Sequence, residues 1–210
     1  TENVLAKTFR IRGTVKETLA TIQRGRAVRL DVPELNGRPF VMFSGVGFDA
    51  AVTRKVHADR DGPITRASYY GPIARLFFTY RFPRLTVRVD DEVLCDDAGL
   101  VFLGNTPQYA DRMHICGRAV ADDGLLDVCC FRTQSRWKLG PHMLRVKLGR
   151  HVDHDRVAYG QGRRITVTSD GAPEPVQADG DALAETPATY TIRPKALTLL
   201  VPPGDLLDDE

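Results

Sequence analysis

The sequence predicts a mainly β fold of the α+β class, an antiparallel two-layer β-sandwich with a few helices. From Leu85 onward, apolar runs are short, alternating or continuous, and turn residues separate them, as in a sandwich. One helical pattern, at 134–148, interrupts these runs. With 210 residues, the chain is long enough to bury one sizeable core.

The first quarter of the chain is predicted to be helical and then extended. Apolar residues recur with helical spacing in two segments, 3–9 and 14–23. Two strands are predicted next, at 27–32 and 39–46. Asn36-Gly37 lies between them and is the strongest hairpin signal in the chain.

The remaining elements follow from periodicity and from glycine and proline. Helices are predicted at 48–58 and 64–80, with Gly71-Pro72 expected to break or restart the second one. Short strands are predicted at 85–89, 92–95, 99–104, 125–132, 164–168, 174–178, 188–193 and 196–201. Sheet edges in such sandwiches often pair, so a homodimer is an open possibility.

Charge and hydropathy exclude some classes of partner. A formal net charge of +2 gives no general attraction for nucleic acid, and no run approaches the roughly 20 apolar residues that span a bilayer. Between 54 and 88, however, basic residues interleave with aromatic ones. Such a stretch fits peripheral contact with an anionic membrane. A solvated helix face with inward aromatics is the alternative, and it explains the pattern somewhat better. The residues are Arg54, Lys55, Arg60, Arg66, Arg75, Arg81, Arg84 and Arg88, with Tyr69, Tyr70, Phe77, Phe78, Tyr80 and Phe82.

The four cysteines show no metal-ligand spacing and are expected to be reduced, as in the cytoplasm. Cys129 and Cys130 are adjacent within a predicted strand, so their side chains should point to opposite faces of a sheet. The other two are Cys95 and Cys116.

Two turns place carboxylates beside a glycine between apolar runs: Asp122-Asp123-Gly124 and Asp179-Gly180-Asp181. Asp-Gly is common in hairpins that catalyse nothing. Carboxylates on tight turns also serve as oxygen ligands for a hard cation or as acceptors of a proton. The two turns together favour phosphoryl-transfer chemistry.

Several segments resemble, in the same order, the C-terminal half of the soluble diacylglycerol kinase and sphingosine kinase family. They are Thr1-Glu2-Asn3-Val4-Leu5-Ala6-Lys7, Gly45-Val46-Gly47-Phe48-Asp49-Ala50, Gly104-Asn105, Asp122-Asp123-Gly124-Leu125-Leu126-Asp127, Gln177-Ala178-Asp179-Gly180-Asp181, Pro194-Lys195-Ala196-Leu197 and Leu200-Val201-Pro202. The resemblance implies a lipid kinase that uses ATP and Mg²⁺, with the sandwich as its second domain.

The family's Gly-Gly-Asp-Gly-Thr nucleotide loop does not occur in this sequence. The resemblance therefore implies that residues 1–25 belong to, or pack on, a nucleotide-binding domain outside the chain, and that 26–210 form the substrate and catalytic-base domain. The chain alone is then expected to be inactive.

The resemblance also implies roles for residues on the two turns. A magnesium ion, structural and electrostatic rather than chelated by ATP, is expected on the Asp123 carboxylate and the carbonyls of Val120 and Leu125. Asp122 and Asp127 are weaker candidates, and Asp127 is as readily a strand residue that faces solvent.

Asp181 matches the family's proposed general base, with Asp179 in reserve. The family commonly has glutamate there, and misplacement by about 1 Å can cost on the order of 100-fold in rate.

Thr1, Asn3 and Asn105 are the residues that the resemblance assigns to the nucleotide side of the cleft. Thr1 and Asn3 are equally ordinary helix caps. Asp49 is either a helix N-terminal carboxylate, which we favour, or a cleft residue.

Three functions follow as hypotheses. The first is the acceptor domain of an ATP-dependent kinase that phosphorylates diacylglycerol or a related lipid at a membrane surface. The second is a non-catalytic lipid- or partner-binding module. The third is a kinase of the same fold that acts on a soluble acceptor.

Overall fold

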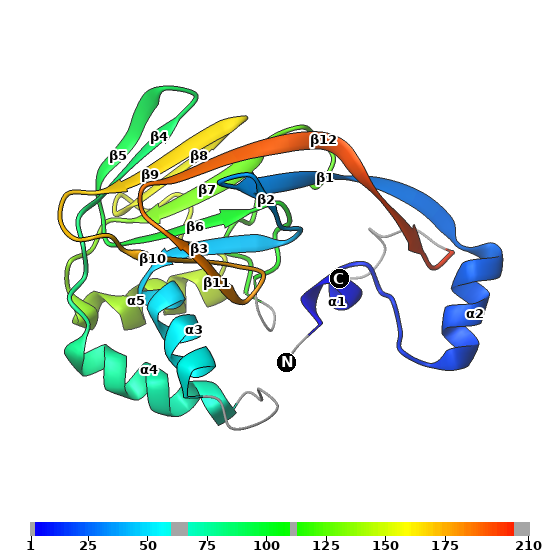
Figure 1. The fold of residues 1–210 in the computed structure, drawn as a ribbon, viewed down its shortest axis with the longest axis horizontal. Helices are drawn as coiled ribbons and strands as arrows, with labels where there is room; N and C mark the ends of the chain where they lie inside the picture. Colours follow the sequence, from blue (N-terminus) through cyan, green and yellow to red (C-terminus); the bar gives the residue numbers. More distant parts are fainter. Residues whose placement is uncertain (1–2, 60–66, 110–112, 204–210) are drawn as a thin grey trace.

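The computed structural model describes residues 3–59, 67–109 and 113–203 and contains two antiparallel sheets of six strands each (Figure 1). The first sheet has the spatial order β2 (Arg38–Pro39), β1 (Arg26–Leu35), β12 (Ala188–Val201), β9 (Arg164–Ser169), β4 (Leu85–Val89) and β5 (Glu92–Ala98). The second has the order β11 (Asp181–Glu185), β10 (Pro175–Ala178), β3 (Phe43–Gly47), β6 (Leu100–Gly104), β7 (Leu126–Phe131) and β8 (Val157–Gly162). The predicted antiparallel sandwich is confirmed.

Helices add a layer on the outer face of the second sheet, below β3 and β6 in Figure 1. They are α3 (Phe48–Ala58), α4 (Ala67–Thr79), the 3₁₀ helix η1 (Arg136–Lys138) and α5 (Leu139–Lys147). Strands β6 and β7 are consequently buried on both faces. Val128 and Cys130 pack between the sheets, whereas Cys129 and Phe131 pack under the helices. This double burial explains why these strands read as continuous apolar runs.

The same alternation confirms the prediction that Cys129 and Cys130 point to opposite faces. All four cysteines are buried and free. None of the described helices is long and apolar enough to cross a membrane.

Strands β1 and β12 form a long ribbon that extends beyond the sandwich toward α1 (Val4–Thr8) and α2 (Val15–Arg24) (Figure 1). The register of the pair shifts between Leu30 and Val32, and Lys195 has a φ of 51°. Residues 188–201 were predicted as two strands, and this prediction is wrong. The irregularity bends one continuous strand without ending it.

Other boundaries also differ from the predictions. The segment 39–46 is not one strand, because β2 ends at Pro39 and β3 begins at Phe43. Strands β8 and β11 were not predicted. Helix α4 runs through Gly71-Pro72 without a break, since Tyr69 and Leu76 on either side pack against the same core. The start of the predicted helix at 64–66 lies outside the described residues.

His142 makes the stability of the helical layer dependent on pH. It is 1% exposed, and its ring lies 5.2 Å from that of Phe131. Burial, aided by the charge of Arg145, lowers the pKa of His142 to about 4. Because this folded-state pKa lies below the ordinary value, the stabilisation is complete above about pH 6.5 and is lost as the pH falls toward 4.

We expect the titration of His142 to make the free energy of unfolding about 2 kcal/mol lower at about pH 5 than at about pH 7.5. Denaturant unfolding of His142→Leu at both pH values should show this difference removed, while the exposed His114→Leu variant keeps it. An equal pH dependence in wild type and His142→Leu would contradict the assignment.

Candidate active site

The Asp179–Asp181 turn joins β10 to β11 and presents its two carboxylates differently. Asp179, with a φ of 49°, accepts hydrogen bonds from the backbone N–H groups of Val41 (2.6 Å), Met42 (2.9 Å) and Phe43 (3.1 Å). Asp181 is exposed, and no hydrogen bond reaches its carboxylate from the part of the chain that the structure describes. The geometry therefore favours a positioning role for Asp179 and leaves Asp181 available to a substrate.

Behind this turn, Gln177 links it to Asp49. Gln177 is 1% exposed; its Oε1 accepts from the Gly180 N–H (3.0 Å), and its Nε2 donates to Asp49 Oδ2 (2.8 Å). The Tyr109 hydroxyl donates to Asp49 Oδ1. Burial raises the pKa of the Asp49 carboxyl, and these two hydrogen bonds partly offset the rise.

Asp49 was predicted to act chiefly as a helix N-terminal carboxylate. It does lie in the first turn of α3, but that helix has no side-chain cap, and the Asp49 oxygens bind Tyr109 and Gln177 instead. The predicted helix N-terminal carboxylate is therefore confirmed by position, although it makes no capping hydrogen bond, and the alternative of a cleft residue stays a prediction. Burial raises the pKa of Tyr69, and the charges of Asp49 and Asp181 raise it further.

Gly45 makes room for this network. A Cβ at Gly45 would lie 2.3 Å from Asp49 Oδ2 and 3.1 Å from Gln177 Nε2. We expect Gly45→Ala to displace the Asp49 carboxylate, to cost about 1–3 kcal/mol of stability, and to free the Gly180 amide. Amide hydrogen exchange at Gly180 should then be at least roughly tenfold faster.

Gly140→Ala is the matched control, since nothing lies within 4 Å of the added Cβ. It should leave Gly180 exchange unchanged and should be neutral or slightly stabilising, as expected within a helix. Unchanged Gly180 exchange in Gly45→Ala would show that the Gln177 link does not hold the turn.

The Asp123 turn is fixed by a buried carboxylate that the sequence analysis missed. Asp31 has no exposed surface; its Oδ2 accepts from the Gly124 N–H and its Oδ1 from the Lys195 N–H, both at 2.6 Å. The Asp31 N–H also donates to the Ala121 carbonyl (2.7 Å). Asp31 occupies the irregularity in β1, so both sides of the turn are held against the ribbon.

The residues of this turn fit a magnesium ion. Asp123 is exposed, and its Oδ1 accepts from the Leu125 N–H at 2.9 Å. Asp123 and the carbonyls of Val120 and Leu125 would offer oxygen ligands from one short segment, the type that Mg²⁺ prefers. Among the described residues, no group of three or more His, Cys, Asp or Glu side chains could hold a metal ion. A site here would therefore rely on carbonyls and water.

The two weaker candidates differ in burial. Asp122 is exposed, whereas Asp127 is 1% exposed and accepts a hydrogen bond from the Tyr159 hydroxyl (2.7 Å). Burial raises the pKa of Asp127 to about 6. The expectation that Asp127 faces solvent is therefore wrong, because its strand is covered on both faces.

Asn105 connects the two turns through the segment 41–43. Its Nδ2 donates to the carbonyls of Asp31 (2.9 Å) and Val41 (3.0 Å), and its backbone N–H donates to Met42 (2.9 Å). The N–H groups of the same segment bind Asp179. The structure thus brings together Asp31, Asn105 and Asp179, far apart in the sequence, on one framework. The predicted nucleotide contact of Asn105 stays a prediction.

The N-terminal segment supplies two further predicted site residues. Thr1 lies outside the described residues. Asn3 caps α1, accepting from the Ala6 N–H at 3.0 Å. The predicted cap is therefore confirmed, and the nucleotide contact of Asn3 stays a prediction.

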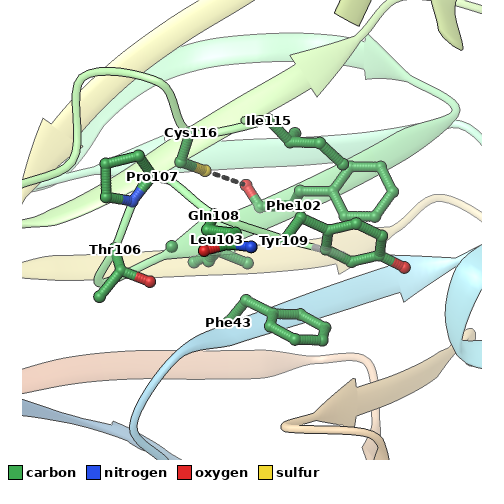
Figure 2. Close-up of a pocket in the computed structure, with 10 residues that line it drawn as sticks. Phe43, Phe102, Leu103, Thr106, Pro107, Gln108, Tyr109, Ile115 and Cys116 are labelled. Carbon is green, nitrogen blue, oxygen red and sulfur yellow. Dashed lines mark hydrogen bonds between the residues drawn. The ribbon is translucent and has the colours of Figure 1, made fainter. Parts of the chain in front are cut away.

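Figure 2 shows a small pocket next to this network. In it the Phe43 ring faces Tyr109, whereas Pro107 and Cys116 lie farther along the wall. The rings of Phe43 and Tyr109 lie 4.6 Å apart between centroids. The Phe43 N–H binds Asp179, and the Tyr109 hydroxyl binds Asp49. The apolar pocket is therefore joined by hydrogen bonds to the turn that carries Asp181.

These features define a β-sandwich domain of the kind found in diacylglycerol and NAD kinases. The family model described as the YegS C-terminal NAD kinase β-sandwich-like domain matches residues 42–201. The chain belongs to this family of diacylglycerol kinase- and YegS-like proteins, which confirms the resemblance inferred from its motifs.

Relatives and solved structures agree with this family. The diacylglycerol kinase of Mycobacterium tuberculosis is 32% identical over 164 residues, which are 78% of this chain and 52% of that protein. The diacylglycerol kinase of Staphylococcus aureus is 21% identical over 210 residues, which are 100% of this chain and 66% of that protein. The chain thus spans about half to two thirds of these relatives.

A crystal structure of a diacylglycerol kinase from Bacillus anthracis superposes with a TM-score of 0.67 at 22% identity, over 96% of this chain and 66% of that one. A second structure from the same organism gives a TM-score of 0.71 at 19% identity, over 94% and 65%. At these identities the likeness shows the fold.

Proposed function

We propose that this chain is the acceptor-binding and catalytic-base domain of an ATP- and magnesium-dependent lipid kinase, with diacylglycerol or a related lipid as acceptor. The observation that supports this most is the framework at 41–43, which joins the turn of the proposed base, Asp181, to the turn of the proposed magnesium ligand, Asp123. The names of the relatives favour diacylglycerol as the acceptor.

In the proposed reaction, the acceptor hydroxyl oxygen attacks the γ-phosphorus, the bond from that phosphorus to the ADP oxygen breaks, and the hydroxyl proton passes to Asp181. A magnesium ion bound at Asp123 would supply positive charge that stabilises the anionic phosphates of ATP. Asp179 and Gln177 hold the turn that carries Asp181, because Asp179 accepts from the Met42 N–H and Gln177 accepts from the Gly180 N–H. Asp49 and Tyr109 connect the turn to the small apolar pocket by hydrogen bonds.

Helix α2 supports the proposal that residues 1–25 pack on a nucleotide-binding part of a longer protein. Val15, Leu19 and Ile22 lie on one face of this helix and are 77%, 52% and 64% exposed. An apolar helix face of this kind normally packs against another surface. The ATP site and the full activity would then require that part. The free cysteines fit a cytoplasmic location, and peripheral membrane contact is part of the same proposal.

The test is transfer of labelled γ-phosphate from ATP with magnesium to diacylglycerol, ceramide, sphingosine and NAD. It compares the 210-residue chain with a version extended upstream through a nucleotide-binding part. The proposal predicts a labelled lipid with the extended version alone. Transfer to NAD in place of lipid would favour a soluble acceptor, and lipid binding without transfer by either version would favour a non-catalytic module.

A further inference from the structure

Helices α4 and η1 carry an uncovered aromatic face on the outside of the helical layer. On α4, Tyr70 is 70% and Phe78 64% exposed, and Ile73, three residues after Tyr70, is 41% exposed. The opposite side of α4, with Tyr69 and Leu76, packs on the core of the helical layer. Packing against this core therefore does not explain why Tyr70, Ile73 and Phe78 are apolar. These three side chains form an exposed apolar stripe at helical spacing.

The stripe continues onto η1. Trp137 is 72% exposed, and its ring lies 5.7 Å from that of Phe77, edge to face. The Arg136 guanidinium donates to the Phe78 carbonyl and ties the two helices together. We call Tyr70, Ile73, Phe77, Phe78 and Trp137 the α4–η1 face.

The charge around the α4–η1 face has one sign. No Asp or Glu occurs in 67–89 or in 128–152, the segments that contain both helices. Within the described ranges, no carboxylate pairs with the exposed Arg75, Arg81 or Lys138.

The rest of the basic stretch at 54–88 behaves differently. Arg54 pairs with Glu185, Lys55 with Asp59, and Arg84 with Asp96 and Asp170. Arg60 and Arg66 lie outside the described residues. Arg88, on β4, donates to the Asp91 carbonyl and pairs with no carboxylate among the described residues. The other unpaired basic residues of this stretch, Arg75 and Arg81, lie on α4 and two residues after it.

We propose that the α4–η1 face docks on an anionic lipid bilayer. Tryptophan and tyrosine favour the interface between headgroups and acyl chains, and basic residues beside them are attracted to anionic headgroups. A protein partner would need a complementary acidic surface with a matching apolar shape, whereas a bilayer supplies both negative charge and an adaptable apolar layer. The inference goes beyond the proposed reaction, because docking needs no phosphate transfer.

Trp137 gives a direct probe, since it is the chain's one tryptophan. We expect its fluorescence to shift to shorter wavelength when the 210-residue chain meets vesicles of phosphatidylcholine with phosphatidylglycerol. Vesicles of phosphatidylcholine alone should give little or no shift. Salt at about 0.5 M should reverse most of it, because exposed charges are then screened.

Two charge-matched variants separate local from general attraction. Arg75→Glu/Arg81→Glu and Arg163→Glu/Arg164→Glu both lower the formal net charge from +2 to −2. The first pair should weaken vesicle binding at least about 20-fold. The second pair, exposed at the β8–β9 connection, should weaken it only a few-fold, since it leaves the α4–η1 face intact. Phe78→Ser should also weaken binding, while Val93→Ser on β5, 54% exposed in wild type, should not.

Equal weakening by both charge variants would overturn the proposal, and so would vesicle binding that leaves Trp137 fluorescence unchanged. A Trp137 shift that follows protein concentration without vesicles would assign the face to self-association instead. Circular dichroism of every variant would show that the fold is retained. Phosphate transfer is measured separately, so failure of docking would leave the proposed reaction untouched.

Discussion

Replacing Asp181 with Asn in a version of the protein that carries a nucleotide-binding part is expected to lower turnover at least about 100-fold. Asn has the shape of Asp but does not accept the hydroxyl proton. Because Asp181 is exposed and free of hydrogen bonds within the described residues, its replacement should change the free energy of unfolding by no more than about 0.5 kcal/mol. Initial rates and denaturant unfolding measure the two effects.

Asp181→Glu should retain activity, because it keeps the carboxylate and restores the length that the resemblance implies for the family. Glu185→Gln, on the same strand, is the control and should leave turnover unchanged, since Glu185 makes an exposed ion pair with Arg54. If Asp181→Asn turned over as fast as wild type, Asp181 would not be the base.

Replacing Asp31 with Ala is expected to lower the free energy of unfolding by about 4 kcal/mol. The change removes the acceptor of the buried Gly124 N–H and of the partly buried Lys195 N–H, which each bind at 2.6 Å. A buried donor without a partner costs about 1–3 kcal/mol, and a hydrogen bond to a charged group contributes more than a neutral one. Denaturant unfolding measures this loss.

Asp31→Asn keeps one acceptor oxygen and should lose about half as much. Glu34→Ala on the same strand should cost about 1 kcal/mol or less, since its ion pair with Arg193 is exposed at the surface. Amide exchange at Gly124 should rise in Asp31→Ala and stay unchanged in Glu34→Ala. A loss no larger for Asp31→Ala than for Glu34→Ala would show that Asp31 does not hold the Asp123 turn.

Elements whose cause is local were predictable from the sequence. The apolar runs of β6 and β7 follow from burial on both faces, and Asn36-Gly37 forms its hairpin with φ values of 50° and 79°. Strand β8 has a glycine-rich end, which the pattern does not favour. A Cβ at Gly160 would lie 3.1 Å from Leu94, and one at Gly162 would lie 2.4 Å from Val89. These glycines leave room for the side chains of Leu94 and Val89, which come close to β8 only in the folded chain.

The candidate site was predictable only in part for the same reason. The two Asp-Gly turns have a local signature, but the groups that hold them come from far along the chain. Asp31 is separated from Gly124 by 93 residues and from Lys195 by 164. Asp49 meets Gln177 across 128 residues. Asp31 lies within a strand, and no local sequence pattern indicates that its carboxylate accepts hydrogen bonds from a distant turn.

The most direct test of the proposed site uses a photoreactive diacylglycerol analogue with its reactive group beside the free hydroxyl. After irradiation with the 210-residue chain, mass spectrometry locates the labelled residues. The proposed site predicts labelling at the pocket of Phe43 and Tyr109 and at the Asp179–Asp181 turn, suppressed by excess diacylglycerol. Labelling confined to the first sheet, or labelling that excess diacylglycerol does not suppress, would contradict it.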